Sequence, residues 1–400
     1  MNKFLITLAT IVAFASSSIA YADVKISGFL QQIAGMGDDV DGGLTYKFNR
    51  FSFGADTTTD NGWTVGGSFA AEFGNMAGGN MSGYLPTSNS MYIQTDMATI
   101  TIGSTADAVT GLVPRVGNMV PGGGHDAGYQ FLFDAGNLAA NGVPYAEAYY
   151  AMANNRINVA LPSVNGFSVQ ATYTPDMGVN SSSGIGRASD ANSGSHGETT
   201  HVAISYSGEM DGMSYTIGLG SISGNAEGNT LTNTLSTYDN NDLSSFTGAV
   251  KVSMGAITLG VHAYDNGDSF GAASDADKAA NSGYTVAMEY NMGNITVGAG
   301  LAHQERTLGT RAATNQATPA AATAGHVKED DVTFVGVGYN MGGGVNSFIQ
   351  FNSMSYTDGN HATVTDTDPN TLSMGITLSL IHISEPTRLR RISYAVFCLK

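Results

Sequence analysis

The chain has few charged residues, and this scarcity limits what it can be. Only 12% of its 400 residues are Asp, Glu, Lys or Arg, and only 16 are basic. Nucleic acid binding depends on clusters of basic side chains, so we expect no nucleic acid partner. Leu, Glu, Lys and Arg, which favour helices, are all scarce, and this argues against a helical enzyme.

Cysteine is almost absent as well. The single cysteine, Cys398, lies near the end of a segment that begins LSLIHISEPTR at Leu378–Arg388 and resembles a translated sequencing adapter. The composition changes at the same point, because basic residues crowd into a chain that is otherwise poor in them. We therefore expect residues 378–400 to be a foreign tail, and the protein without it to have no thiol and no disulfide.

Long apolar runs are missing after the first residues. Met1–Ala22 combines the basic Lys3, an apolar run at Phe4–Phe14 and a small-residue cleavage pattern, as secretory signal peptides do. The mature chain is expected to begin at Asp23. No later segment approaches the ~20 apolar residues that a membrane helix requires.

The sequence contains instead a recurring hairpin pattern. Ser253–Gly260 reads SMGAITLG, and Asn291–Gly298 reads NMGNITVG. In each, one strand ends, a short glycine-containing turn follows, and a new strand alternates apolar and polar residues.

Sixteen strands of this kind can be placed along residues 23–377, and they alternate between short turns and long polar loops. This arrangement is typical of a transmembrane β-barrel with short periplasmic turns and long outer loops. The first outer loop is expected at Met36–Gly43, and the third and longest at Asp107–Tyr145. The predicted strands are Val24–Ala34, Leu44–Asp56, Trp63–Asn75, Ser90–Met97, Thr99–Thr105, Ala146–Leu161, Phe167–Pro175, Thr199–Ser207, Ser214–Ser223, Ser244–Met254, Ala256–Asp265, Gly283–Asn291, Asn294–Glu305, Asp331–Asn340, Gly344–Tyr356 and Thr371–Thr377.

The alternation within each strand assigns one face to lipid and one to water. In Ala256–Asp265, Ile257 and Leu259 share one face, and Thr258 and Gly260 share the other. A soluble β-sandwich would also alternate, but the signal peptide, the number of strands and the one-sided long loops favour apolar faces that point outward. Water in the lumen of so wide a barrel can then satisfy the polar inward residues.

Four segments resemble the general diffusion porins of alphaproteobacteria, of the photosynthetic-bacterium type. They are Asp23–Gly28, Arg50–Gly67, Tyr92–Gly103 and Tyr339–Gly344. The resemblance implies a sixteen-stranded homotrimer in the outer membrane of a Gram-negative bacterium. It also implies that the third long loop, Asp107–Tyr145, folds into the lumen and narrows it.

Members of that family set an acidic loop against basic wall residues at the constriction. The acidic candidates here are Asp107, Asp126, Asp134 and Glu147. Strand parity places the basic candidates Arg50, Arg156 and Lys251 on the lumen side. His201 and His262 are weaker candidates for the same role. Arg115 and His125 within the loop depart from a purely acidic pattern.

The expected function is passive diffusion of ions and small hydrophilic solutes across the outer membrane. The formal net charge of -17 favours a modest preference for cations, although screening limits the reach of outer-loop acids to ~8–10 Å at physiological salt.

Other functions stay open on the sequence alone. A substrate-specific channel is one alternative, and a barrel-type surface hydrolase or adhesin is another. His201 and Ser205 share a strand face, but such pairs are common in a serine-rich chain, so no enzyme is expected. No cofactor is expected either, although the acidic clusters Asp38–Asp41 and Asp239–Asp242 could bind Ca²⁺ through loop oxygens.

Overall fold

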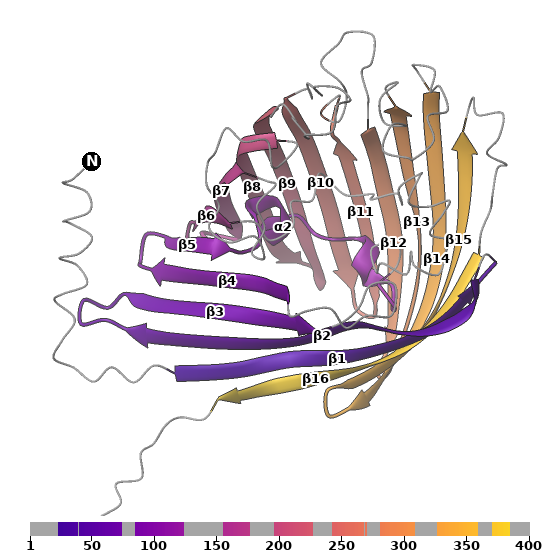
Figure 1. The fold of residues 1–400 in the computed structure, drawn as a ribbon, viewed down its shortest axis with the longest axis horizontal. Helices are drawn as coiled ribbons and strands as arrows, with labels where there is room; N and C mark the ends of the chain where they lie inside the picture. Colours follow the sequence, from indigo (N-terminus) through magenta and orange to yellow (C-terminus); the bar gives the residue numbers. More distant parts are fainter. Residues whose placement is uncertain are drawn as a thin grey trace, which may run out of the picture.

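Sixteen antiparallel strands form one closed barrel in the computed structural model (Figure 1). Each strand pairs with its neighbours in sequence, and β1 (Asp23–Gly37) closes the ring by pairing with β16 (Asn370–Ser384). The structure describes residues 23–38, 40–73, 85–123, 155–176, 196–226, 242–267, 269, 281–308, 326–358 and 370–384. The predicted fold class is confirmed.

The remaining strands follow the chain in order around the ring. They are β2 (Val40–Thr58), β3 (Thr64–Phe73), β4 (Leu85–Gln94), β5 (Thr99–Ser104), β6 (Asn155–Ala160), β7 (Phe167–Asp176), β8 (His196–Met210), β9 (Met213–Ala226), β10 (Leu243–Met254), β11 (Ile257–Asp265), β12 (Asn281–Met292), β13 (Ile295–Leu308), β14 (His326–Gly342) and β15 (Val345–Asp358).

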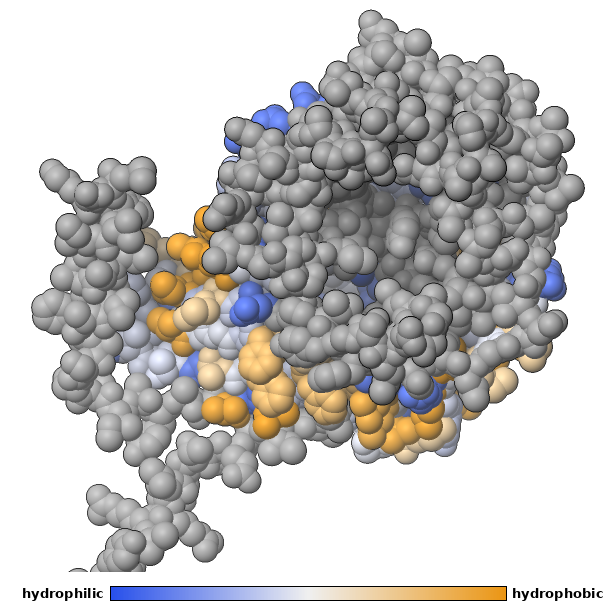
Figure 2. Space-filling view, in the orientation of Figure 1, coloured by the Kyte–Doolittle hydropathy of each residue, from blue (hydrophilic) through white to orange (hydrophobic). Residues whose placement is uncertain are grey.

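The wall is apolar outside and polar or small inside. On β9, Ile217 and Leu219 are exposed, whereas Ile222 on the opposite face is buried. On β11, Leu259 and Val261 are exposed, whereas His262 and Tyr264 on the opposite face are buried. Figure 2 shows hydrophobic residues gathered on the outer surface of the wall. The strand faces therefore lie as the alternation predicts, with an outer surface suited to lipid.

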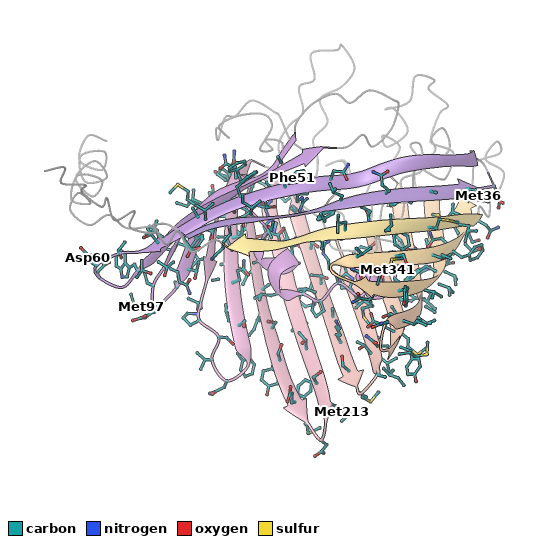
Figure 3. All side chains as sticks on the ribbon, turned by 90° about the horizontal axis from the view of Figure 1, so that it is seen from below. Met36, Phe51, Asp60, Met97, Met213 and Met341 are labelled. Atoms are coloured by element: carbon teal, nitrogen blue, oxygen red, sulfur yellow. The ribbon has the colours of Figure 1, made fainter. Side chains whose placement is uncertain are left out.

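The turns on one rim are as short as the hairpin pattern predicts. Gly255 and Gly293 adopt φ values of 58° and 76° in two of these turns, a conformation that glycine accepts without steric cost. Figure 3 shows Asp60 and Met97 together at one end of the strands and Met36 at the opposite end. The long connections leave from the end where Met36 lies.

The prediction of a long first loop at Met36–Gly43 is wrong. β1 continues to Gly37, β2 begins at Val40, and these two residues pair across the ladder. Asp38 in the turn is held from β16, since its carboxylate accepts hydrogen bonds from Asn370 N at 2.9 Å and Asn370 Nδ2 at 3.0 Å. Main-chain pairing thus extends through a segment whose polar composition suggested a loop.

The last strand is longer than predicted. β16 runs through Ser384, seven residues beyond Thr377, and pairs Leu378 with Leu30 of β1. LSLIHIS keeps the phase of the preceding strand through Leu380. The register then shifts between Leu380 and Ile383, and the ladder continues beyond the bulge whatever the origin of the segment. The closing strand therefore includes the beginning of the segment expected to be foreign.

The chain between β5 and Gly123 lies inside the barrel. It contains the short helix α2 (Ala108–Leu112) and the 3₁₀ turn η1 (Gly117–Met119). α2 contacts β7, β8 and β9, and η1 contacts β12 and β13 (Figure 1). Within the described ranges, no helix is long and apolar enough to cross a membrane. The expectation that the third loop folds into the lumen is met for its described part.

A charge placed on the outer face tests the assignment of that face. We expect Val261→Arg, in the middle of β11, to lower the free energy of unfolding from lipid vesicles by ~2–4 kcal/mol. Ile257→Arg, at the end of the same strand and on the same face, should cost only ~0–1 kcal/mol because the side chain reaches the interface. Equal costs in denaturant titrations would contradict a lipid-facing β11.

Candidate functional site

Asp107, Arg156 and His201 meet at the point where the inner loop leaves the wall. Arg156 Nη1 donates to Asp107 Oδ2 at 3.2 Å, and His201 Nδ1 lies 3.4 Å from Asp107 Oδ1. All three residues are buried, with exposed fractions of 2%, 2% and 0%. The structure thus brings one acidic loop residue into contact with two predicted wall residues.

The same carboxylate starts α2. Asp107 is the N-cap residue, and it accepts hydrogen bonds from Thr110 N at 2.9 Å and Thr110 Oγ1 at 3.0 Å. Aspartate is a favoured N-cap because its side chain satisfies a backbone N–H that the helix leaves free. One side chain therefore both shapes the loop and attaches it to the wall.

Neighbouring hydroxyl and amide groups complete the attachment. Ala108 N donates to Thr172 Oγ1 of β7 at 2.8 Å, and Thr172 Oγ1 donates to Asn158 Oδ1 of β6 at 2.9 Å. The other ring nitrogen of His201 lies 3.3 Å from Thr199 Oγ1. We call Asp107, Arg156, His201 and Thr172 the loop anchor.

Burial alone would raise the pKa of Asp107. The adjacent His201, the Thr110 backbone N–H and the Arg156 guanidinium outweigh burial and hold the pKa of Asp107 well below its usual range. The carboxylate is therefore ionised at neutral pH and neutralised by groups in direct contact with it. A contact pair of this kind contributes little field to the rest of the lumen.

The other predicted basic residues lie apart from the anchor. Arg50 is on β2, with its guanidinium carbon 5.9 Å from the Phe29 ring centroid. Lys251 is on β10 and exposed, in register with Gly260 of β11. His262 on β11 is buried, with Nε2 2.7 Å from Thr247 Oγ1.

Asp126, Asp134 and Glu147 lie outside the described residues, so the structure does not place the other predicted acids. Asp39 and residues 239–241 of the two acidic clusters are also outside them. In the part of the chain that is described, no group of three His, Cys, Asp or Glu residues is arranged to hold a metal ion. Loop-bound Ca²⁺ stays a prediction.

Sequence reasoning missed the apolar side of the loop. Val109, Val113 and Val116 are buried against the inner wall together with Met119 and Val120. These residues stand in a segment rich in glycine and proline, which suggested a solvated loop. The signal that could have revealed them is the helix-like spacing of Val109, Val113 and Val116. Small inward-facing glycines on the wall strands would accept such a face.

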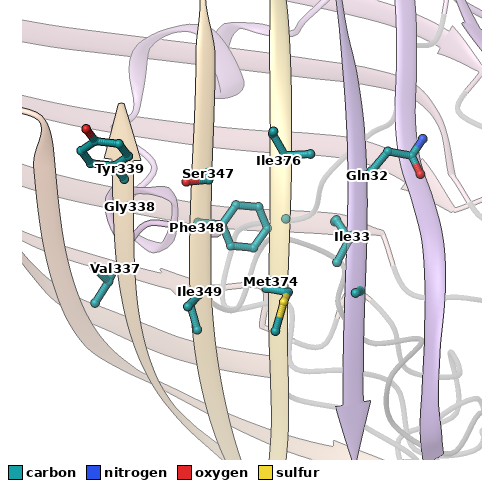
Figure 4. Close-up of a pocket in the computed structure, with 12 residues that line it drawn as sticks. Gln32, Ile33, Val337, Gly338, Tyr339, Ser347, Phe348, Ile349, Met374 and Ile376 are labelled. Atoms are coloured by element: carbon teal, nitrogen blue, oxygen red, sulfur yellow. The ribbon is translucent and has the colours of Figure 1, made fainter. Parts of the chain in front are cut away.

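A groove of about 520 Å³ crosses β14, β15, β16 and β1 away from the anchor (Figure 4). Its lining is almost wholly apolar and includes Val337, Ile349 and Met374, all exposed on the outer face. It contains none of the predicted site residues, so the lumen and its loop remain the functional candidate.

Comparisons with known proteins agree with this architecture. A family model described as Gram-negative porin matches residues 7–360. No curated protein sequence matches the chain.

Three solved structures illustrate the likeness in fold. The trimer form of OmpT from Vibrio cholerae is 13% identical, with a TM-score of 0.58 over 90% of this chain and 99% of that one. An anion-selective porin from Comamonas acidovorans is 12% identical, with a TM-score of 0.57 over 90% and 100%. A mutant porin of Rh. blastica is 16% identical, with a TM-score of 0.54 over 89% and 100%.

The loop anchor supports a prediction about stability. Asp107→Asn keeps a good N-cap residue but removes the charge that faces Arg156, leaving a buried guanidinium without its carboxylate. We expect the free energy of unfolding at pH 7 to fall by about 3–5 kcal/mol. Asp56→Asn, which breaks the exposed pair with Lys25 (2.6 Å), is the control and should cost ~0–1 kcal/mol. Equal losses would show that the anchor is an ordinary surface pair.

The pH dependence of the same variant has a definite sign. Because folding lowers the pKa of Asp107, its stabilisation is fully present above the unfolded value of about 3.9 and is lost as pH falls below it. The difference in unfolding free energy between the native protein and Asp107→Asn should shrink as pH falls below about pH 4. A difference that grows on acidification would contradict the assigned cause.

Proposed function

The chain belongs to the Gram-negative porin family, and on this basis we propose that it is a general diffusion pore of the outer membrane. It carries ions and small hydrophilic solutes passively through a water-filled lumen that the loop at residues 107–145 constricts. The observation that carries the proposal is the closed sixteen-strand wall, apolar outside, with the described part of that loop seated within it.

The geometry of the barrel supports a diffusion pore rather than an enzyme. A wall of sixteen strands is wide enough to leave an aqueous channel once its lumen is only partly filled. The described part of the loop, up to Gly123, lies along the inner side of β7–β15. The anchor residues bind one another and hold the loop, so we assign them a structural role and propose no enzymatic activity.

We further propose a modest cation preference. The acidic excess of the chain favours cations at the mouth of the pore. Asp107 does not contribute, because the buried Arg156 guanidinium neutralises it in contact. The preference therefore depends on the acids of the outer loops and on Asp126 and Asp134 of the constriction loop, opposed by the lumen charges of Arg50 and Lys251.

Assembly and lineage are further parts of the proposal. We propose a homotrimer embedded in outer-membrane lipid, of the alphaproteobacterial type, exported with the help of the segment Met1–Ala22. The OmpT structure described as a trimer form supports the proposed homotrimer, since it shares the fold.

Planar-bilayer recording of the refolded protein tests the proposed function. We expect the conductance to rise in steps of three as pores insert. We also expect the conductance to fall smoothly as the radius of added polyethylene glycols decreases. A current that saturates with one solute would identify a substrate-specific channel instead. Absence of conductance together with lipid hydrolysis would replace the pore with a surface hydrolase.

Ion selectivity is tested in the same recordings. In a salt gradient, the reversal potential should have the sign of cation preference, and Arg50→Gln should enlarge it because a lumen cation is removed. Arg50→Lys retains the charge and should leave the potential near the native value. Anion preference in the native protein would reject this part of the proposal.

A further inference from the structure

The inner loop rests on glycines of the barrel wall. Inward-facing glycines on β9, β11, β13 and β14 each lie against a loop atom at the place where a Cβ would stand. The loop residues that cover them follow in chain order around the wall, from Val109 at β9 to Pro121 at β14. We call this set the glycine seat, and its members are Gly218, Gly220, Gly260, Gly298, Gly336 and Gly338.

At several seat glycines an added Cβ would stand closer to loop atoms than van der Waals contact allows. A Cβ on Gly218 would lie 2.6 Å from Leu112 O, and one on Gly298 would lie 3.0 Å from Val120 Cα. A Cβ on Gly336 would overlap Pro121 O. Glycine weakens a strand interior, and there it often marks a place where another backbone approaches closely. The loop backbone is that neighbour here.

Glycine-rich composition alone does not explain the seat. Three other inward glycines of the barrel are covered differently, by an aromatic ring of an adjacent strand. The Tyr92 ring stands over Gly66, and the Phe334 ring stands over Gly300. Figure 4 shows the Phe348 ring reaching from β15 toward β16, where it covers Gly375. The seat is therefore defined by the loop and separable from the other inward glycines.

The strands between the seat glycines present small residues at the same level. Ala203 of β8 is in register with Gly220, Ala249 of β10 with Gly218, and Ala287 of β12 with Gly260. All three alanines are buried in the same cluster as the loop valines. Three strands between the seat strands thus present alanine where the loop crosses them.

We propose that the glycine seat sets how far the loop stands from the wall and thereby the size of solute that the pore admits. This rests on the proposed function. A loop held closer to the wall leaves more of the lumen open, and each methyl group added beneath it moves it toward the pore axis. The seat glycines are then specificity-determining residues, although none of them faces the solute.

Two classes of contact within the seat give different expectations. At Gly218 and Gly336 the obstructing atoms belong to the loop backbone, so an added methyl must displace the loop. At Gly260 the nearest atom is Met119 Sδ at 2.6 Å, the end of a flexible side chain that can turn aside. Alanine should therefore narrow the pore more at Gly218 and Gly336 than at Gly260.

The test measures single-channel conductance and polyethylene glycol exclusion for Gly218→Ala, Gly336→Ala and the double variant. We expect a loss of conductance and a smaller exclusion radius for each, largest in the double variant, and a lesser loss for Gly260→Ala. Gly54→Ala is the matched control, because Gly54 also faces inward but its Cβ would meet only ordinary contacts at 3.7 Å. Unchanged or increased conductance in the seat variants, or an equal loss at Gly54, would overturn the proposal.

Deletion of residues 108–122 separates loop effects from damage to the barrel. In that background, Gly336→Ala should no longer change conductance, because the atoms it displaces are gone. A loss that persists without the loop would show that the methyl group acts on the wall, and the seat would be rejected. A seat variant that folds only after the deletion would support the proposal, since the obstacle is then the loop. A native protein that does not conduct would refute the proposed pore, which is a result distinct from all of these.

Discussion

Backbone hydrogen bonding in a lipid environment is the constraint on which the rest of the structure depends. A strand in a bilayer has no water to satisfy its N–H and C=O groups, so a sheet can cross only if it has no free edge. Pairing of β1 with β16 removes the last edge. Ring closure in turn sends alternate side chains outward to lipid and inward to a lumen, and this division decides where a loop, a charge or a solute can be placed.

The lumen is organised by how the loop is attached. A buried carboxylate with a lowered pKa, Asp107, is held by Arg156 and His201 at the start of the loop. Beyond it, valines and Met119 pack against glycine and alanine of the wall. The attachment is thus electrostatic at one point and apolar along the rest of the described loop.

Much of this fold could be predicted because strand alternation is a local signal. The pattern around Gly255 and Gly293 placed the turns, and parity placed Arg156 and His201 on the inner face. The extent of β1 and β2 could not be predicted, because main-chain pairing overrode the polar composition of Met36–Gly43. The contact of Asp107 with Arg156 joins residues 49 positions apart, and it depends on how the loop turns at α2. Inward glycines were visible in the sequence, but their covering by the loop arises only in three dimensions.

The central claim is that the loop lies inside a conducting lumen, and Asn118 tests it directly. Asn118 is exposed within η1, between Gly117 and Met119, which are buried. In a Cys398→Ser background, Asn118→Cys should react with a charged, water-soluble methanethiosulfonate reagent, and the reaction should reduce the current through a single channel. Ile257→Cys, on the outer face, should leave the current unchanged. Labelling of Asn118→Cys without any change in current would place the loop outside the path of ions and contradict the account.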